Sequence, residues 1–93
     1  MKLPILYNKF NSHVRRLARE QYIVEQESKC YYCYSDLNKL PPKKITNKPI
    51  NVKLFPRGFF QHPLHLHHDH KTGLTLGTVH SLCNAVLWQY EGE

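Results

Sequence analysis

The sequence predicts a small α+β domain that a bound metal ion stabilises. Residues 11–29 lack Pro and Gly and favour a helix, residues 64–79 favour a β-hairpin, and residues 81–91 favour a second helix. A chain of 93 residues buries only a modest core and usually needs cross-links. Because three cysteines cannot form a complete disulfide framework, metal is the expected cross-link.

The first predicted helix, residues 11–29, follows from the spacing of its apolar residues. These recur at helical intervals, at Val14, Leu17, Ala18 and either Gln21 or Tyr22. Asn11 or Ser12 can cap the helix, because both side chains accept hydrogen bonds from free backbone N–H groups. Three arginines lie largely off the apolar stripe, where they can face phosphates or plain solvent: Arg15, Arg16 and Arg19.

Residues 30–63 contain a Cys-x-x-Cys pair, at Cys30 and Cys33, and then a basic insert rich in proline. Proline prevents regular strand pairing, so we expect an irregular surface loop with one short strand at residues 50–55, "INVKLF". The insert supplies further candidate contacts to a nucleic-acid backbone, at Lys43, Lys44, Lys48, Lys53 and Arg57.

The hairpin is predicted from "LHLHHDH" at residues 64–70, a Lys-Thr-Gly turn, and "LTLGTV" at residues 74–79. The helix that follows, residues 81–91, has Ser81 as its expected N-cap. Its apolar positions fall near helical spacing, at Leu82, Val86, Leu87 and Tyr90.

A second metal-ligand pair with the spacing of Cys30 and Cys33 lies at His80 and Cys83. Two pairs complete a tetrahedron, and soft sulfur and nitrogen ligands favour zinc. The sequence therefore predicts a structural Cys3His zinc site that uses every cysteine of the chain. The alternative is that the cysteines are buried free thiols.

The charge of the chain indicates a polyanionic partner. Thirteen Lys and Arg residues against seven Asp and Glu residues give a net charge of +6. Nucleic acid is the commonest cellular polyanion, although a solvated basic surface without a partner has the same charge. The sequence shows no signal peptide and no transmembrane stretch, so we expect an intracellular protein that does not enter membranes.

Four of the seven histidines crowd into six residues, at His65, His67, His68 and His70. The adjacent His67 and His68 face a helix that begins near Asn84, which suggests a second metal ion beside a general base. Phosphodiester hydrolysis uses such parts: a cation on the phosphate and a neutral imidazole that deprotonates water. The alternatives are further structural metal ligands or a tag-like histidine tract.

Residues 30–87 resemble the HNH (His-Me finger, ββα-metal) nucleases, and within them the zinc-bearing phage recombination endonuclease VII group. The motifs that carry this resemblance are "CYYC", "HLHHDHKTG" and "GTVHSLCN". The resemblance implies a single ββα-metal domain over residues 1–93. Its parts are an N-terminal helical segment (1–29), a zinc knuckle with the basic insert (30–63) and the ββα-metal core (64–93).

The resemblance also implies roles for single residues. His68 matches the general base, Asn84 the metal ligand of the helix, and His65 and His70 match histidines that support the site. His67 stands where the endonuclease VII group has a metal-binding Asp, although colicin nucleases carry a comparable His-His pair. Leu76 replaces an Arg of many members, so that one phosphate contact is either missing or supplied by Arg57.

These observations and the resemblance predict a cytoplasmic DNA endonuclease with structural Zn²⁺ and a catalytic Mg²⁺ or Mn²⁺ ion, and the resemblance leaves open that a phage encodes it in a bacterial host. We expect nicking or weakly specific cleavage of duplex DNA, which leaves 5′-phosphate and 3′-hydroxyl ends, by a monomer or a homodimer. Two alternatives stay open at this stage: a non-catalytic zinc-binding nucleic-acid module, and an RNase on the same scaffold.

Overall fold

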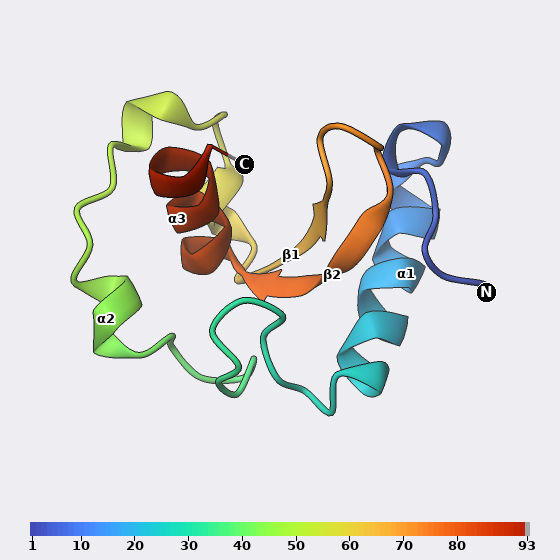
Figure 1. Cartoon of the computed structure of the whole chain (residues 1–93), viewed down its shortest axis with the longest axis horizontal. Helices are drawn as coiled ribbons and strands as arrows, with labels where there is room; N and C mark the ends of the chain where they lie inside the picture. Colours follow the sequence, from blue (N-terminus) through green and yellow to red (C-terminus); the bar gives the residue numbers. More distant parts are fainter. Residues whose placement is uncertain (93) are drawn as a thin grey trace.

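The computed structural model describes residues 1–92, and its architecture centres on one antiparallel hairpin. Strands β1 (Leu64–His68) and β2 (Thr75–His80) lie between helix α1 (Ser12–Glu25) and helix α3 (Ser81–Glu91), as Figure 1 shows. The α+β class predicted from the sequence is confirmed. The remaining elements are short: η1 (Tyr7–Lys9), α2 (Lys43–Thr46), η2 (Val52–Leu54) and η3 (Phe59–Gln61).

Two apolar clusters lie on opposite faces of the hairpin. The cluster on the α3 face contains Cys30, Leu37, Ile45, Val79, Cys83 and Val86. The cluster on the α1 face contains Ile5, Ala18, Tyr22 and Leu66. Among the buried strand residues, Val79 of β2 belongs to the cluster on the α3 face and Leu66 of β1 belongs to the cluster on the α1 face. The small core is therefore divided, and each half is limited in what it can stabilise by itself.

Helix α1 begins as the sequence predicts and ends earlier than it predicts. The Asn11 side chain caps it by accepting a hydrogen bond from the Val14 N–H at 3.1 Å. The helix ends at Glu25 instead of Lys29, because Glu27 and Ser28 adopt positive φ angles. Leu17 is 40% exposed, so the buried stripe consists of Ala18 and Tyr22, with Val14 partly buried.

The side chain of Gln26 explains where α1 stops. Its amide nitrogen donates to the Thr78 carbonyl oxygen at 3.0 Å, and its amide oxygen accepts from the Thr78 N–H at 2.8 Å. Gln26 thus pairs with β2 as a neighbouring strand would. Gly77 makes this approach possible, since an added Cβ would lie 2.7 Å from Gln26 Oε1 and 2.8 Å from the Tyr31 ring.

The hairpin carries one irregularity. Paired residues run from Leu64 opposite His80 to His67 opposite Gly77, and a register shift follows between His67 and His68. The first strand ends at His68, two residues before the predicted end. Asp69 then starts the turn by accepting hydrogen bonds from the N–H groups of Lys71 and Thr72.

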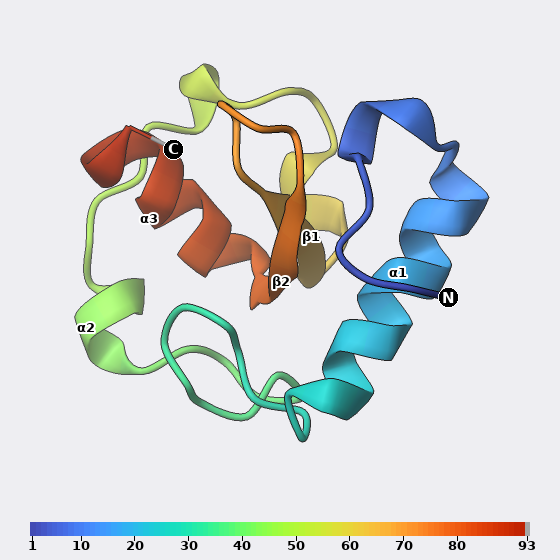
Figure 2. The ribbon, with the colours of Figure 1, turned by 45° about the vertical axis from the view of Figure 1, so that its right-hand side comes forward.

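The N-terminal segment adds a strand-like edge that the sequence did not predict. Leu6 forms an isolated bridge with Leu74, and the Tyr7 N–H donates to the Gly73 carbonyl at 2.8 Å. Figure 2 shows this segment running beside the hairpin. The segment covers the outer edge of β2, whereas the outer edge of β1 has no strand partner among residues 1–92.

Two predictions about the rest of the chain are wrong. Residues 50–55 form no strand: Val52–Leu54 form the 3-10 turn η2, because the Asn51 side chain accepts from the Lys53 N–H and no described strand pairs with this segment. In α3, His80 is the N-cap and Ser81 the first helical residue, and Tyr90 is exposed. Helix α2, which buries Ile45, had no counterpart in the sequence-based prediction. No helix in the described part of the chain is long and apolar enough to cross a membrane.

Candidate functional site

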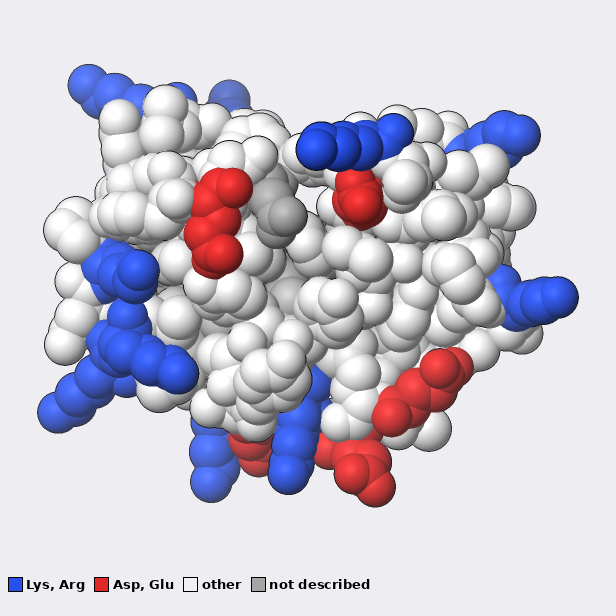
Figure 3. All heavy atoms as spheres, viewed as in Figure 1, with Lys and Arg blue, Asp and Glu red and all other residues white. Residues whose placement is uncertain are grey.

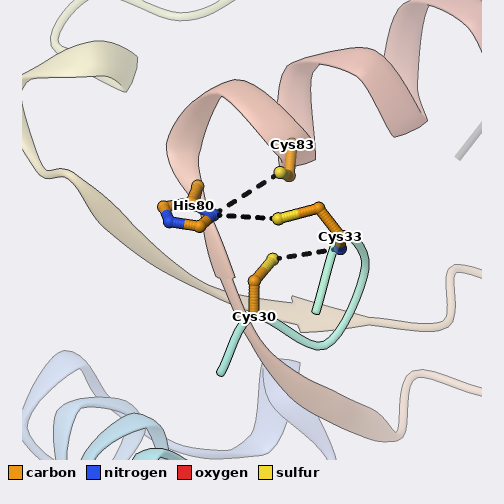
Figure 4. A group of neighbouring side chains, drawn as sticks. All are labelled: Cys30, Cys33, His80 and Cys83. Carbon is orange, nitrogen blue, oxygen red and sulfur yellow. Dashed lines mark hydrogen bonds between the residues drawn. The ribbon is translucent and has the colours of Figure 1, made fainter. Parts of the chain in front are cut away.

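The three cysteines and His80 meet at one point on the α3 face of the hairpin. Cys30 and Cys33 lie in the tight turn after α1, His80 ends β2, and Cys83 lies in the first turn of α3 (Figure 4). Their ligand atoms all lie within 4.8 Å of one another. The N–H groups of Tyr32 and Cys33 point at Cys30 Sγ, at 3.4 Å and 3.5 Å, and stabilise a thiolate there.

The imidazole of His80 is oriented as a metal ligand requires. Its Nε2 lies 3.0 Å from the Asp36 carbonyl oxygen and 2.9 Å from that of Lys39. Carbonyl oxygens only accept, so Nε2 carries the proton and Nδ1 keeps its lone pair. Nδ1 lies 3.5 Å from Cys33 Sγ and 3.6 Å from Cys83 Sγ. Such backbone contacts commonly fix the tautomer of a metal-bound histidine.

The acidities of the thiols agree with a cation-binding role. The hydrogen bond from the Cys83 thiol lowers the pKa of Cys30 to about 4, against the opposing effect of burial. The same hydrogen bond and burial raise the pKa of Cys83. A bound cation would release that proton too, because thiolates are the metal-binding form. Three sulfur ligands and one imidazole nitrogen can hold a zinc ion.

The other histidines border a second site, a cavity of about 460 Å³ along the free edge of β1. We call it the histidine cavity, and the predicted residues that line it are His65, His67, His68, His70 and Asn84. It touches both faces of the sheet, since residues of α1 and residues of α3 contribute to its walls. The structure thus brings together the five residues that the sequence selected, and it does so around a strand edge.

His65 fixes the orientation of Asn84. Its Nε2 donates to the Phe59 carbonyl oxygen at 2.8 Å, so its Nδ1 accepts from the Asn84 amide nitrogen at 3.1 Å. The Asn84 amide nitrogen is therefore engaged, and the Asn84 amide oxygen is left as the available ligand atom. Burial lowers the pKa of His65, so this imidazole is neutral at neutral pH and can keep accepting that hydrogen bond.

His68 lies on the opposite side of the strand edge, against the N-terminal segment. Its ring stacks on the Tyr7 ring, with centroids 4.0 Å apart and planes 12° from parallel. The guanidinium of Arg15 also lies over the Tyr7 ring, at 4.0 Å. Burial, followed by the nearby His70, His67 and Arg15, lowers the pKa of His68. His68 is therefore a neutral imidazole at neutral pH, as a general base must be.

The two remaining histidines differ in exposure. His67 is 4% exposed and shares the α3 face of the sheet with His65, and its ring lies 6.2 Å from that of Tyr31. His70 is exposed, and its ring lies between those of His68 and Trp88, at 4.8 Å and 6.3 Å.

The candidate phosphate contacts divide into two groups. Arg15, Arg19 and Arg57 line the histidine cavity. Arg16 faces away from it and contacts His13 at 3.4 Å. The lysines of the insert lie elsewhere, and Figure 3 shows basic side chains gathered over α2, which carries two of them; the four are Lys43, Lys44, Lys48 and Lys53.

Sequence reasoning missed three aromatic residues that line the cavity, Tyr7, Phe59 and Trp88. Helical spacing could have predicted the position of Trp88, because it lies one turn after Asn84 on the same face of the helix. No pattern in the sequence could have predicted the positions of Tyr7 and Phe59, since these depend on contacts between distant segments.

No protein-family model, curated protein or solved structure matches this chain. Its function is therefore inferred from the motifs of the sequence and from the geometry of the two sites.

Proposed function

We propose that the protein is a metal-dependent DNA endonuclease of the HNH, or ββα-metal, type, with His68 as its general base. The observation that supports this most is the convergence of His67, His68 and Asn84 on one basic cavity. The order of the elements also agrees with the proposal, because α3 follows the hairpin directly. Zinc at the Cys3His cluster would be structural, since four protein ligands leave no open position for a substrate.

Each residue of the cavity has a role in this proposal. His68 takes the proton of the attacking water, and its neutral state at neutral pH suits that task. Asn84 and His67 offer an amide oxygen and an imidazole nitrogen to a divalent cation, and His65 holds the Asn84 amide in place. When bound, Mg²⁺ or Mn²⁺ would stabilise charge on the phosphate and on the departing 3′ oxygen.

The arginines of the cavity hold the DNA backbone. Arg15, Arg19 and Arg57 come from two different segments, so their charges surround the phosphate from two sides. No Asp or Glu lines the cavity among the described residues, and the Arg15 guanidinium contacts only neutral groups of Tyr7, its carbonyl oxygen and its ring. Their positive charge is therefore available to phosphates, which they would position without reading the base sequence.

Plasmid nicking tests the proposal. Purified protein and its His68→Ala variant are incubated with supercoiled plasmid and with Mg²⁺ or Mn²⁺. We expect the variant to cleave about 10²- to 10⁴-fold more slowly, the usual contribution of a general base. His13→Ala is the matched control, because His13 is exposed on α1 outside the cavity and should be dispensable.

Two results would reject the proposal. If the protein bound plasmid but did not nick it with any of the divalent ions, the protein would be a non-catalytic nucleic-acid-binding module. Rapid cleavage of a structured RNA with intact plasmid would identify a ribonuclease on the same scaffold.

A further inference from the structure

The histidine cavity has walls of contrasting chemistry. The wall from α1 carries Arg15 and Arg19. The wall from α3 and the η3 segment carries Trp88 and Phe59, together with Arg57. No Asp or Glu occurs among the described residues that line it. Phosphates suit the basic wall, while an aromatic wall offers a surface on which bases stack.

Trp88 has an unusual combination of support and exposure. Its ring leans on Phe55, with centroids 5.4 Å apart and planes 30° apart, and Phe55 is buried. Phe59 lies 6.4 Å away on the same side of the cavity. Trp88 nevertheless remains 40% exposed, so a rigid apolar base supports an indole that is open to the cavity.

The position of Trp88 relative to the histidines fits one nucleotide. The ring of His70 lies 6.3 Å from the indole and 4.8 Å from the ring of His68, and all three residues line the cavity. A base on the indole would place its own phosphate or the next one at His68. A base inside a duplex is covered on both faces by its neighbours, so only an unpaired base could stack there.

We propose that Trp88 stacks on an unpaired base of single-stranded DNA whose phosphates lie against the arginines of the histidine cavity. This rests on the proposed function, which it deepens by naming the substrate: a single-stranded or locally opened strand instead of a continuous duplex. Affinity would come from charge and stacking together, as in other proteins that bind single strands.

The test uses the only tryptophan of the chain as its probe. Short oligothymidylate is titrated into the His68→Ala protein, which avoids cleavage, and indole fluorescence is recorded. We expect saturable quenching, because a stacked base quenches indole emission. An oligonucleotide with abasic sites should bind through its phosphates but leave the emission unchanged.

Variants at Trp88 provide a second readout, the affinity for a labelled oligonucleotide. Removal of one stacked aromatic should weaken binding of single-stranded DNA by roughly 5- to 150-fold, but leave duplex binding within about twofold. Trp88→Ala and Trp88→Leu should both show this loss, and Trp88→Phe should restore most of the affinity. Tyr90→Leu is the matched control, because Tyr90 is similarly exposed on α3 outside the cavity.

The outcomes separate this inference from the proposed function. Cleavage by the wild type without quenching, or equal losses of single-stranded and duplex affinity, would overturn the stacking site alone. A Trp88→Leu protein that binds single-stranded DNA as tightly as the wild type would also overturn the stacking site. This test remains available even if Trp88→Ala fails to fold. Quenching by a protein that never cleaves DNA would support the stacking site and reject the nuclease.

Discussion

The two histidine sites of this chain lie on the same hairpin but are held in opposite ways. At the Cys3His cluster, two backbone carbonyls orient His80, and four ligand atoms converge within 4.8 Å. In the histidine cavity, His68 is held mainly by stacking on Tyr7, and His70 is exposed. The first arrangement closes around one ion, whereas the second leaves room for a ligand from outside.

The two sites also differ in the charge that they bring to a cation. The cluster offers thiols, and Cys30 ionises readily because the Cys83 thiol donates to it, which lowers the Cys30 pKa. The described residues that line the histidine cavity carry imidazole, hydroxyl, amide and guanidinium groups but no carboxylate. Thiolates of the cluster can neutralise the charge of a divalent ion, whereas the groups that line the cavity cannot. We therefore expect the catalytic ion to bind tightly only when a phosphate supplies the missing negative charge.

The largest effect is expected at the cluster. Cys33→Ser should unfold the protein or lower its melting temperature sharply, because structural zinc contributes about 10–16 kcal/mol in zinc-finger peptides. Elemental analysis should find one zinc ion per chain in the wild type, and chelation should mimic the variant. Protein that contained no zinc and stayed folded after chelation would contradict the assignment of the zinc site. The control variant His13→Ala should change neither the zinc content nor the melting temperature.

A smaller effect is expected at His67, which is the proposed ligand in the cavity. His67→Ala should lower the affinity for the divalent ion that supports nicking by at least about 10- to 100-fold. That is the loss seen when a residue that only supports a metal ligand is replaced. Raised Mn²⁺ should partly restore the rate. The measurement is nicking rate against metal concentration. A variant that is inactive at every Mn²⁺ concentration, beside a fully active His68→Ala, would reverse the two roles.

His67→Asp sharpens the charge comparison. A carboxylate supplies the negative charge that the cavity lacks, so the variant should bind Mg²⁺ without DNA and prefer it to softer ions. Calorimetric titration with Mg²⁺, in the presence and absence of an uncleaved oligonucleotide, measures this. Strong Mg²⁺ binding by the wild-type cavity without DNA would show that no external phosphate is needed.

Tyr7 tests how the stacked histidine is held. Tyr7→Ala should lower the cleavage rate by about 10- to 100-fold, because misplacement of a reacting group by about an ångström has that effect. The concentration of DNA that gives half the maximal rate should change less than the rate, since the Tyr7 ring supports the Arg15 guanidinium as well as His68 but the Arg15 Nε also donates to the Tyr7 backbone carbonyl, which the variant keeps. Tyr7→Phe keeps the stacking ring and should remain active. Equal losses in both variants would point to the phenol hydroxyl instead.

The smallest effect on cleavage is expected from the four lysines of the insert, which do not line the cavity. Replacement of Lys43, Lys44 and Lys48 by Gln should flatten the log–log salt dependence of DNA binding, by about 0.9 in slope for each phosphate that these lysines neutralise. An unchanged slope would place α2 away from the DNA. Replacement of Arg15 and Arg19 should lower the same slope and also slow cleavage, because these two arginines line the cavity.

Local patterns predicted a large part of this molecule. The cap at Asn11, the hairpin and the extent of α3 from Ser81 to Glu91 all follow from neighbouring residues, and all appear in the structure. The paired spacing of cysteine and histidine selected the four ligands that meet. Prediction failed where a distant contact decided the outcome. Gln26 ends α1 by pairing with β2, and the Asn51 N–H donates to Gln89 Oε1 of α3 instead of joining a strand.

By itself, the sequence determined which chemical groups this protein has and which of them share a turn, a strand or a helix face. Only the tertiary structure decided that the histidines border a cavity at a strand edge, with Tyr7 behind His68 and Trp88 beyond His70. It also separated the cavity arginines from the lysines of the insert. Spacing along the chain fixes neighbours within a few residues, but contacts between segments depend on how whole faces pack. The position of a charge or an aromatic ring far along the chain is therefore set only when the hairpin and its two helices assemble.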